Sequence, residues 1–135
     1  MTRQELASKI AEAIAKVEGF YLTRPTLAKR QGNPGNIRRW SNHGPYPTRN
    51  GFVDFVAWAD GDYERGVAEG WRVLRLLVDR YIGGNYTGGK SPSLRQMFHV
   101  YAPSSDHNNP DQYAEAVAKA IGVDADTPLA SLITN

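Results

Sequence analysis

Apolar residues recur every three or four positions at the beginning of the chain, which is the period of one face of an α-helix. The recurring residues are Leu6, Ile10, Ala13, Ile14 and Val17. Thr2 and Glu5 have the spacing of a capping box, and Gly19 is suited to end a helix. The pattern therefore predicts a first helix that begins after Thr2 and ends before Gly19.

The same period returns twice in the second half of the chain. It predicts a long helix over about Tyr63 to Ile82 and a short one near 93–101, where Ser91-Pro92 offers a cap and first turn. A further helix is expected after Asn109, which is a suitable cap, with Pro110 in its first position. Gly122 would end that helix, and a last short turn would follow over 127–133.

Residues 22–50 interrupt this helical pattern with a polar stretch rich in Pro, Gly, Asn and Arg. Turn signals occur at 33–36 and 42–45, and strand candidates at Ile37–Trp40 and Gly51–Phe55 could pair as a hairpin. The pattern thus predicts a mostly α fold of the α+β class, with a small β-hairpin inserted after the first helix. The length of 135 residues fits one domain over 1–135 and leaves too little for two cores.

Composition excludes several classes of protein. No run of about 18 uninterrupted apolar residues occurs, so we expect no membrane insertion. The N-terminal segment lacks the apolar core of a signal peptide, so synthesis in the cytoplasm and delivery by another route are expected. The chain has no cysteine, and His43, His99 and His107 lack the spacing of metal ligands. We therefore expect no metal and no organic cofactor.

Charge is unevenly distributed along the chain. Residues 1–50 carry nine Lys or Arg and three Glu, a net charge of +6, whereas 51–135 has a net charge of −4. Six of these basic residues fall in the polar stretch: Arg24, Lys29, Arg30, Arg38, Arg39 and Arg49. Such a surface attracts an anionic polymer, either nucleic acid or the carboxylate-bearing bacterial cell wall, and a solvated surface without a partner has the same composition.

Glu18 is the candidate for acid–base chemistry. It borders the apolar face of the first helix and lies in its last turn, where the helix dipole places partial negative charge. Partial burial and the dipole both favour the protonated carboxyl, so we expect its pKa to be raised, as cleavage of a glycosidic bond by a general acid requires. A surface Glu at a frayed helix end fits the same position.

Two further groups of residues are candidates for substrate contacts. The segment Asn33–Arg38 can present hydrogen bonds to sugar hydroxyl and N-acetyl groups, although alone it indicates only a turn. Tyr101 and Tyr113 lie beside a polar loop, where they suit either ligand contacts or an amphipathic core.

Several of these segments, in this order, resemble lysozyme-like domains common in phage and prophage genomes. The segments are KVEGFY, GNPGNIRRW, GFVDF, EGWRVL and YAPSSDHNNPDQYAEAVAKAIGV, and the resemblance covers about residues 10 to 133. It implies a lysozyme-like fold, phage or prophage origin, and a plan similar to soluble lytic transglycosylases and goose-type lysozymes. Glu18 matches the catalytic acid, Asn33, Asn36 and Arg38 match the glycan-facing strand, and Tyr101 and Tyr113 match tyrosines beside the cleft.

The sequence departs from this family around GFVDFVAWADGDYERG, which makes Asp54 an individual feature. A hydrolase needs a second carboxylate as nucleophile or base. In the expected strand Gly51–Phe55, alternation places Asp54 towards a groove or solvent, where it can assist Glu18. Without that carboxylate, a group of the sugar itself would attack and give a 1,6-anhydro product, as lytic transglycosylases do.

The resemblance implies an enzyme that cleaves the β-1,4 bond between N-acetylmuramic acid and N-acetylglucosamine in peptidoglycan, and we expect the protein to be a monomer. An alternative is a glycan-binding or phage structural module that keeps the fold without turnover. A nucleic-acid binder is disfavoured, because no expected helix carries a stripe of Lys and Arg and no known motif is present.

Overall fold

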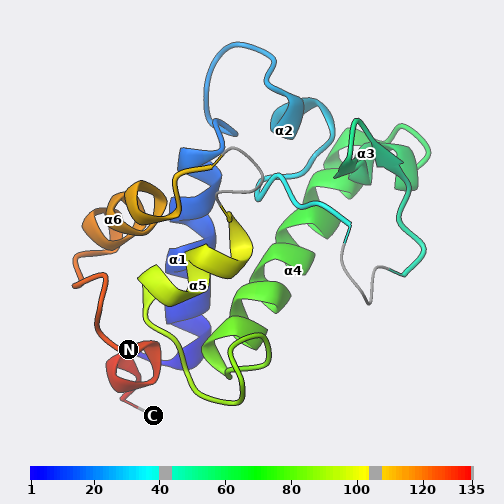
Figure 1. Cartoon of the computed structure of the whole chain (residues 1–135). Helices are drawn as coiled ribbons and strands as arrows, with labels where there is room; N and C mark the ends of the chain where they lie inside the picture. Colours follow the sequence, from blue (N-terminus) through cyan, green and yellow to red (C-terminus); the bar gives the residue numbers. More distant parts are fainter. Residues whose placement is uncertain (40–43, 104–107, 135) are drawn as a thin grey trace. The chain divides into compact units, whose positions relative to one another are not determined.

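The computed structural model describes residues 1–39, 44–103 and 108–134. Over these residues the chain is mostly helical, with one small antiparallel sheet (Figure 1). The elements in chain order are α1 Arg3–Val17, α2 Leu27–Arg30, β1 Thr48–Arg49, β2 Phe52–Val53, α3 Phe55–Trp58, α4 Tyr63–Ile82, α5 Leu94–Tyr101, α6 Pro110–Ile121 and the 3-10 helix η2 Leu129–Leu132. The mostly α prediction of the α+β class is confirmed at this level.

Capping residues fix where the longer helices begin. Thr2 accepts a hydrogen bond from the Glu5 N–H at 3.1 Å, and the Glu5 carboxylate accepts from the Thr2 N–H at 3.3 Å, which confirms the capping box. Asn109 caps α6 as predicted, with Pro110 at its first position. The cap of α5 is Ser93, in a second capping box with Gln96, and the predicted start at Ser91-Pro92 is wrong because it precedes this box.

The chain divides into two compact units. One unit comprises Met1–Ala13 and Arg75–Asn135, and the other comprises Ile14–Leu74. Helices α1 and α4 therefore each contribute residues to both units. That the chain forms a single domain over 1–135 stays a prediction.

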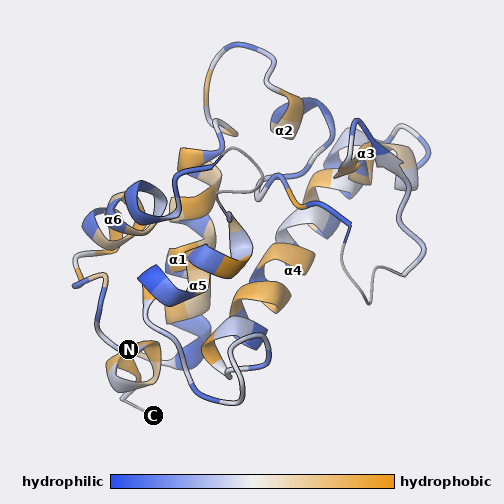
Figure 2. Ribbon diagram, viewed as in Figure 1, coloured by the Kyte–Doolittle hydropathy of each residue, from blue (hydrophilic) through white to orange (hydrophobic). Residues whose placement is uncertain are grey.

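The unit of Met1–Ala13 and Arg75–Asn135 has a helical core. Helices α5 and α6 pack against each other. Each of the two helices carries both hydrophobic and hydrophilic residues (Figure 2). Its largest fully buried side chains are Leu6, Ile10, Val78, Ile82, Leu94, Met97, Phe98 and Leu129. The two ends of the chain meet here, since the Met1 ammonium donates to Thr134 Oγ1 at 2.8 Å and the Thr134 N–H donates to the Met1 carbonyl at 2.9 Å.

The unit Ile14–Leu74 contains the hairpin, seen as two arrows beside α3 in Figure 1. Strand β1 pairs with β2 in antiparallel register, with Arg49 opposite Phe52. The turn between them is Asn50-Gly51, whose φ angles of 56° and 82° are those of a type I′ turn. Asn-Gly is the residue pair that this turn prefers, so the sequence carried a signal for the hairpin at this place.

The predicted strands only partly match this hairpin. A hairpin after the first helix is present, but its first strand is not Ile37–Trp40. Arg38 contributes a single bridge to Phe52, and Trp40 lies outside the described residues. The second predicted strand, Gly51–Phe55, ends at Val53, because Asp54 begins helix α3. The short helices α2 and α3 were not predicted, and each has a side-chain cap, Thr26 and Asp54 respectively.

Two glycines of α4 let other parts of the chain approach the helix backbone, the polar segment at Gly70 and the first residues of α3 at Gly66. A Cβ at Gly70 would lie 2.1 Å from the carbonyl oxygen of Gly32, and one at Gly66 would lie 2.8 Å from that of Phe55. Both glycines are buried, and Gly32 is itself in the left-handed region with φ 61°. Backbone therefore packs on backbone, and no side chain fits between α4 and residues 31–34.

Gly70→Ala is expected to destabilise the protein, although helix propensity alone would stabilise it by about 1 kcal/mol. The added methyl group would overlap the Gly32 carbonyl, and overpacking of this kind costs about 1–3 kcal/mol or more. Denaturant unfolding measures the change. Ala68→Gly, at an exposed position of the same helix, gives the propensity term alone. A Gly70→Ala variant as stable as the wild type would contradict the close packing.

Candidate active site

Glu18 follows directly after the last residue of α1. Its N–H still donates to the Ile14 carbonyl at 2.9 Å, and the side chain is half-buried. The next two N–H groups complete a Schellman motif, Gly19 to Lys16 and Phe20 to Ala15, with Gly19 at φ 77°. The chain turns sharply at this glycine. The carboxyl group is thereby held at the electronegative end of the helix, as predicted.

Asn36 contacts the Glu18 carboxyl group. Its Nδ2 lies 3.4 Å from Glu18 Oε1 and donates to it. Asn36 adopts φ 48°, a left-handed conformation that Asn tolerates better than most residues. Its Oδ1 is buried and has no hydrogen-bond partner among the described residues. The structure thus brings together two of the residues that the sequence predicted for the site, from segments 18 positions apart.

Asn33 holds the segment that carries Asn36. Its side chain is fully buried, Nδ2 donates to the carbonyls of Ile37 at 3.1 Å and Val53 at 3.0 Å, and Oδ1 accepts from the Ile37 N–H at 2.8 Å. Both amide hydrogens are therefore used within the fold. Asn33 therefore has a structural role in this segment, and its contact with a glycan stays a prediction.

Arg38 lies at the exposed edge of this segment. It is bridged to Phe52, and its guanidinium lies 4.5 Å from the centre of the Phe52 ring. The side chain is exposed, which is compatible with the predicted contact to a glycan strand. That contact stays a prediction.

Asp54 has a local structural role. It is 6% exposed, and its Oδ1 accepts a hydrogen bond from the Ala57 N–H at 3.0 Å, which caps α3. The predicted orientation towards a groove or solvent is wrong, because strand β2 ends at Val53 and alternation no longer applies at Asp54. Whether Asp54 takes part in catalysis stays a prediction.

Tyr101 and Tyr113 belong to the other unit, Met1–Ala13 and Arg75–Asn135. Tyr113 is 6% exposed and stacks on Phe98, with ring centres 4.4 Å apart. Tyr101 ends α5, is half-buried, and packs edge-on against both of these rings and against Tyr81. Burial in an aromatic core is therefore shown for Tyr113, and the contact of either tyrosine with a substrate stays a prediction.

A polar network in the Glu18 unit was missed at the sequence level. Arg72 donates to Glu69 through Nε at 2.6 Å and Nη2 at 3.0 Å, and the Tyr46 hydroxyl donates to Glu69 Oε2 at 2.5 Å. Hydrogen bonds from Arg72 hold the pKa of Glu69 below its usual value, and burial followed by the hydrogen bond to Glu69 raises the pKa of Tyr46. The sequence shows the Glu69–Arg72 spacing on a helix, but it does not show that Tyr46 of the polar segment contacts Glu69.

A cluster of aromatic rings includes the residues that follow Glu18 in the sequence. Phe20 packs edge-on against Tyr21 and Trp71, and Tyr21 lies 6.4 Å from Trp71 with an angle of 34° between the rings. Tyr21 is 52% exposed and Trp71 half-buried. An apolar surface therefore begins within three residues of the proposed acid.

Neither a metal site nor a membrane-spanning helix finds support in the part of the chain that the structure describes. It contains no group of three or more His, Asp or Glu that could hold a metal ion. None of its helices is long and apolar enough to cross a membrane. Comparison of the chain with models of protein families, with curated proteins and with solved structures gives no match.

Asn33→Ala is expected to lower the free energy of unfolding by about 3 kcal/mol, because a buried polar group left unsatisfied costs about 1–3 kcal/mol and the change removes three hydrogen bonds. Asn36→Gly is the control, since it keeps the left-handed backbone and removes one long hydrogen bond; we expect a change of under about 1 kcal/mol. Denaturant unfolding measures both. Equal stability of the two variants would show that Asn33 does not hold the segment.

Proposed function

We propose that this protein is a glycosidase with a lysozyme-like fold that cleaves the β-1,4 bond between N-acetylmuramic acid and N-acetylglucosamine in peptidoglycan. The observation that supports this most is the half-buried Glu18 carboxyl, which lies at the C-terminal end of α1 and contacts the Asn36 amide. In the proposed reaction Glu18 donates its proton to the glycosidic oxygen as that bond breaks.

An amide beside the acid suits a group that changes its protonation state during each turnover. The Asn36 N–H group donates to the Glu18 carboxylate, and an amide turned by 180° would offer Oδ1 as acceptor for the proton of the carboxylic acid. Oδ1 has no hydrogen-bond partner within the described structure, so this rotation would break no hydrogen bond made by that atom. We assign Asn36 the role of a positioning residue for Glu18.

The burial of Asp54 favours the route that needs one carboxyl group. Asp54 is engaged as a helix cap, so we do not assign it as the nucleophile or base of a hydrolase. In the proposed route Glu18 protonates the leaving oxygen, and its carboxylate then takes the proton of the sugar's 6-hydroxyl as that oxygen bonds to C1. The product is a 1,6-anhydro sugar, and the proton returns to Glu18 for the next turnover.

Glu18→Gln is expected to lower the rate of muropeptide release from purified cell walls by at least about 10²-fold, the usual contribution of a general acid, and to leave thermal unfolding unchanged. Glu64→Gln removes an exposed carboxylate from the same unit and is expected to keep wild-type activity. An active Glu18→Gln variant would refute the assignment. Binding to cell walls without release of any muropeptide by the wild type would instead favour a non-catalytic binding module.

Asp54→Asn is expected to stay active and to release 1,6-anhydro muropeptides, because Asn also caps helices and the single-acid route does not need the second carboxylate. Mass spectrometry of the products distinguishes the routes. Asp54→Ala is the structural control, which loses the cap and about 1 kcal/mol of stability. Reducing-end products from the wild type, with a large loss of activity in Asp54→Asn, would show that Asp54 is catalytic.

A further inference from the structure

Two arginines flank one aromatic ring on the exposed face of the hairpin. Phe52 pairs with Arg49 across the turn and with Arg38 across the single bridge on its other side. Directly opposite residues of antiparallel strands project to the same face, so all three side chains share one face. The next residue, Val53, is fully buried on the other face. We call Arg38, Phe52 and Arg49 the hairpin face.

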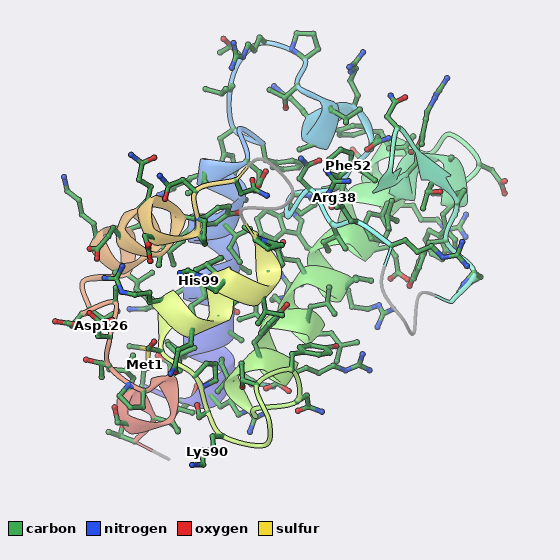
Figure 3. All side chains as sticks on the ribbon, viewed as in Figure 1. Met1, Arg38, Phe52, Lys90, His99 and Asp126 are labelled. Carbon is green, nitrogen blue, oxygen red and sulfur yellow. The ribbon has the colours of Figure 1, made fainter. Side chains whose placement is uncertain are left out.

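The guanidinium of Arg38 is held by this arrangement. It lies over the Phe52 ring, with 4.5 Å from its carbon to the ring centre, and Figure 3 labels the two residues next to each other. A Cβ at Gly51 would lie 3.4 Å from Arg38 Nη1, so this end of the side chain also borders the turn. Stacking on an aromatic ring covers the flat side of a guanidinium, whereas carboxylates bind along its edge, where the N–H groups lie.

The two segments that carry the hairpin face contain basic residues and no acidic ones. Both arginines are exposed, as is Arg39 next to them, while Phe52 is half-exposed. Residues 37–39 and 48–53 contain three Arg and no Asp or Glu. The acidic residue that follows, Asp54, is buried and used as a cap. The face therefore fits a ligand that offers carboxylates beside an apolar group.

We propose that the hairpin face binds the carboxylates of the short peptides that peptidoglycan carries on its glycan strand. This inference rests on the proposed function, because Glu18 belongs to the same unit, Ile14–Leu74. The two guanidinium groups bind carboxylate groups through paired hydrogen bonds, and Phe52 contacts the apolar part of the peptide. A nucleic-acid phosphate also fits guanidinium groups, but this face is a small patch on a hairpin with no extended basic stripe.

The test compares the affinity of the full chain for soluble peptidoglycan fragments that carry peptides with its affinity for the same glycan after enzymatic removal of the peptides. We expect R38A/R49A to bind the peptide-bearing glycan about tenfold more weakly, a larger loss of affinity than the same variant shows for the stripped glycan. R75A/K119A removes the same charge from two exposed positions of the other unit and is expected to change neither affinity. R38K/R49K keeps the charge without the paired donors and is expected to lose most of the affinity.

Several results would overturn this proposal. They are equal wild-type affinity for the two glycans, equal losses in R38A/R49A and R75A/K119A, or wild-type affinity in R38K/R49K. If the wild type binds single-stranded DNA more tightly than the glycans and R38A/R49A loses this binding, the ligand of the hairpin face is a nucleic acid and not a peptide. Thermal unfolding of each variant checks that the hairpin remains folded. Peptide-dependent binding without muropeptide release would support this proposal and refute the glycosidase, so the two fail separately.

Discussion

The burial of a chain segment that has no regular secondary structure is the constraint on which the Glu18 unit depends. Residues 31–35 and Ile37 are buried without belonging to a regular helix or strand, so their backbone polar groups need other partners. The N–H groups of 31–33 donate to carbonyls of α2, and the Ile37 carbonyl accepts from the Val53 N–H. The Asn33 side chain supplies three further hydrogen bonds, and Gly70 of α4 provides the space for this segment. The Asn33 amide and a glycine of α4 thus hold this segment in place, where a longer sheet would hold it by hydrogen bonds between strands.

This one amide connects the two surfaces to which we assign function. Through Ile37 it fixes the residue after Asn36, and Asn36 contacts the Glu18 carboxyl group. Through the Val53 carbonyl it fixes the end of β2, which sets the pairing of Phe52 with its two arginines. The acid and the hairpin face are therefore held by the same buried side chain, and a change at Asn33 is expected to disturb both.

Local signals in the sequence predicted the helices well and the polar segment poorly. The capping box at Thr2, the cap at Asn109 and the bounds Tyr63 to Ile82 of α4 match the structure, because caps and apolar periodicity act within a few residues. The hairpin was placed partly wrong, although Asn50-Gly51 marks its turn. The prediction paired 37–40 with 51–55, whereas Asn50-Gly51 and the cap at Asp54 decide where the strands form and end.

By itself the sequence determined the longer helices, the end of α1 before Gly19 and hence the place of Glu18 at an electronegative helix terminus. Only the tertiary structure decided that Asn33 is buried and Asn36 contacts the acid, although both belong to one short motif. It also decided that Asp54 is a cap and that Tyr46 joins Glu69 and Arg72. The physical reason is that a polar side chain has many acceptable partners, and the chain's packing selects among them. A periodic apolar residue, in contrast, needs only to be buried.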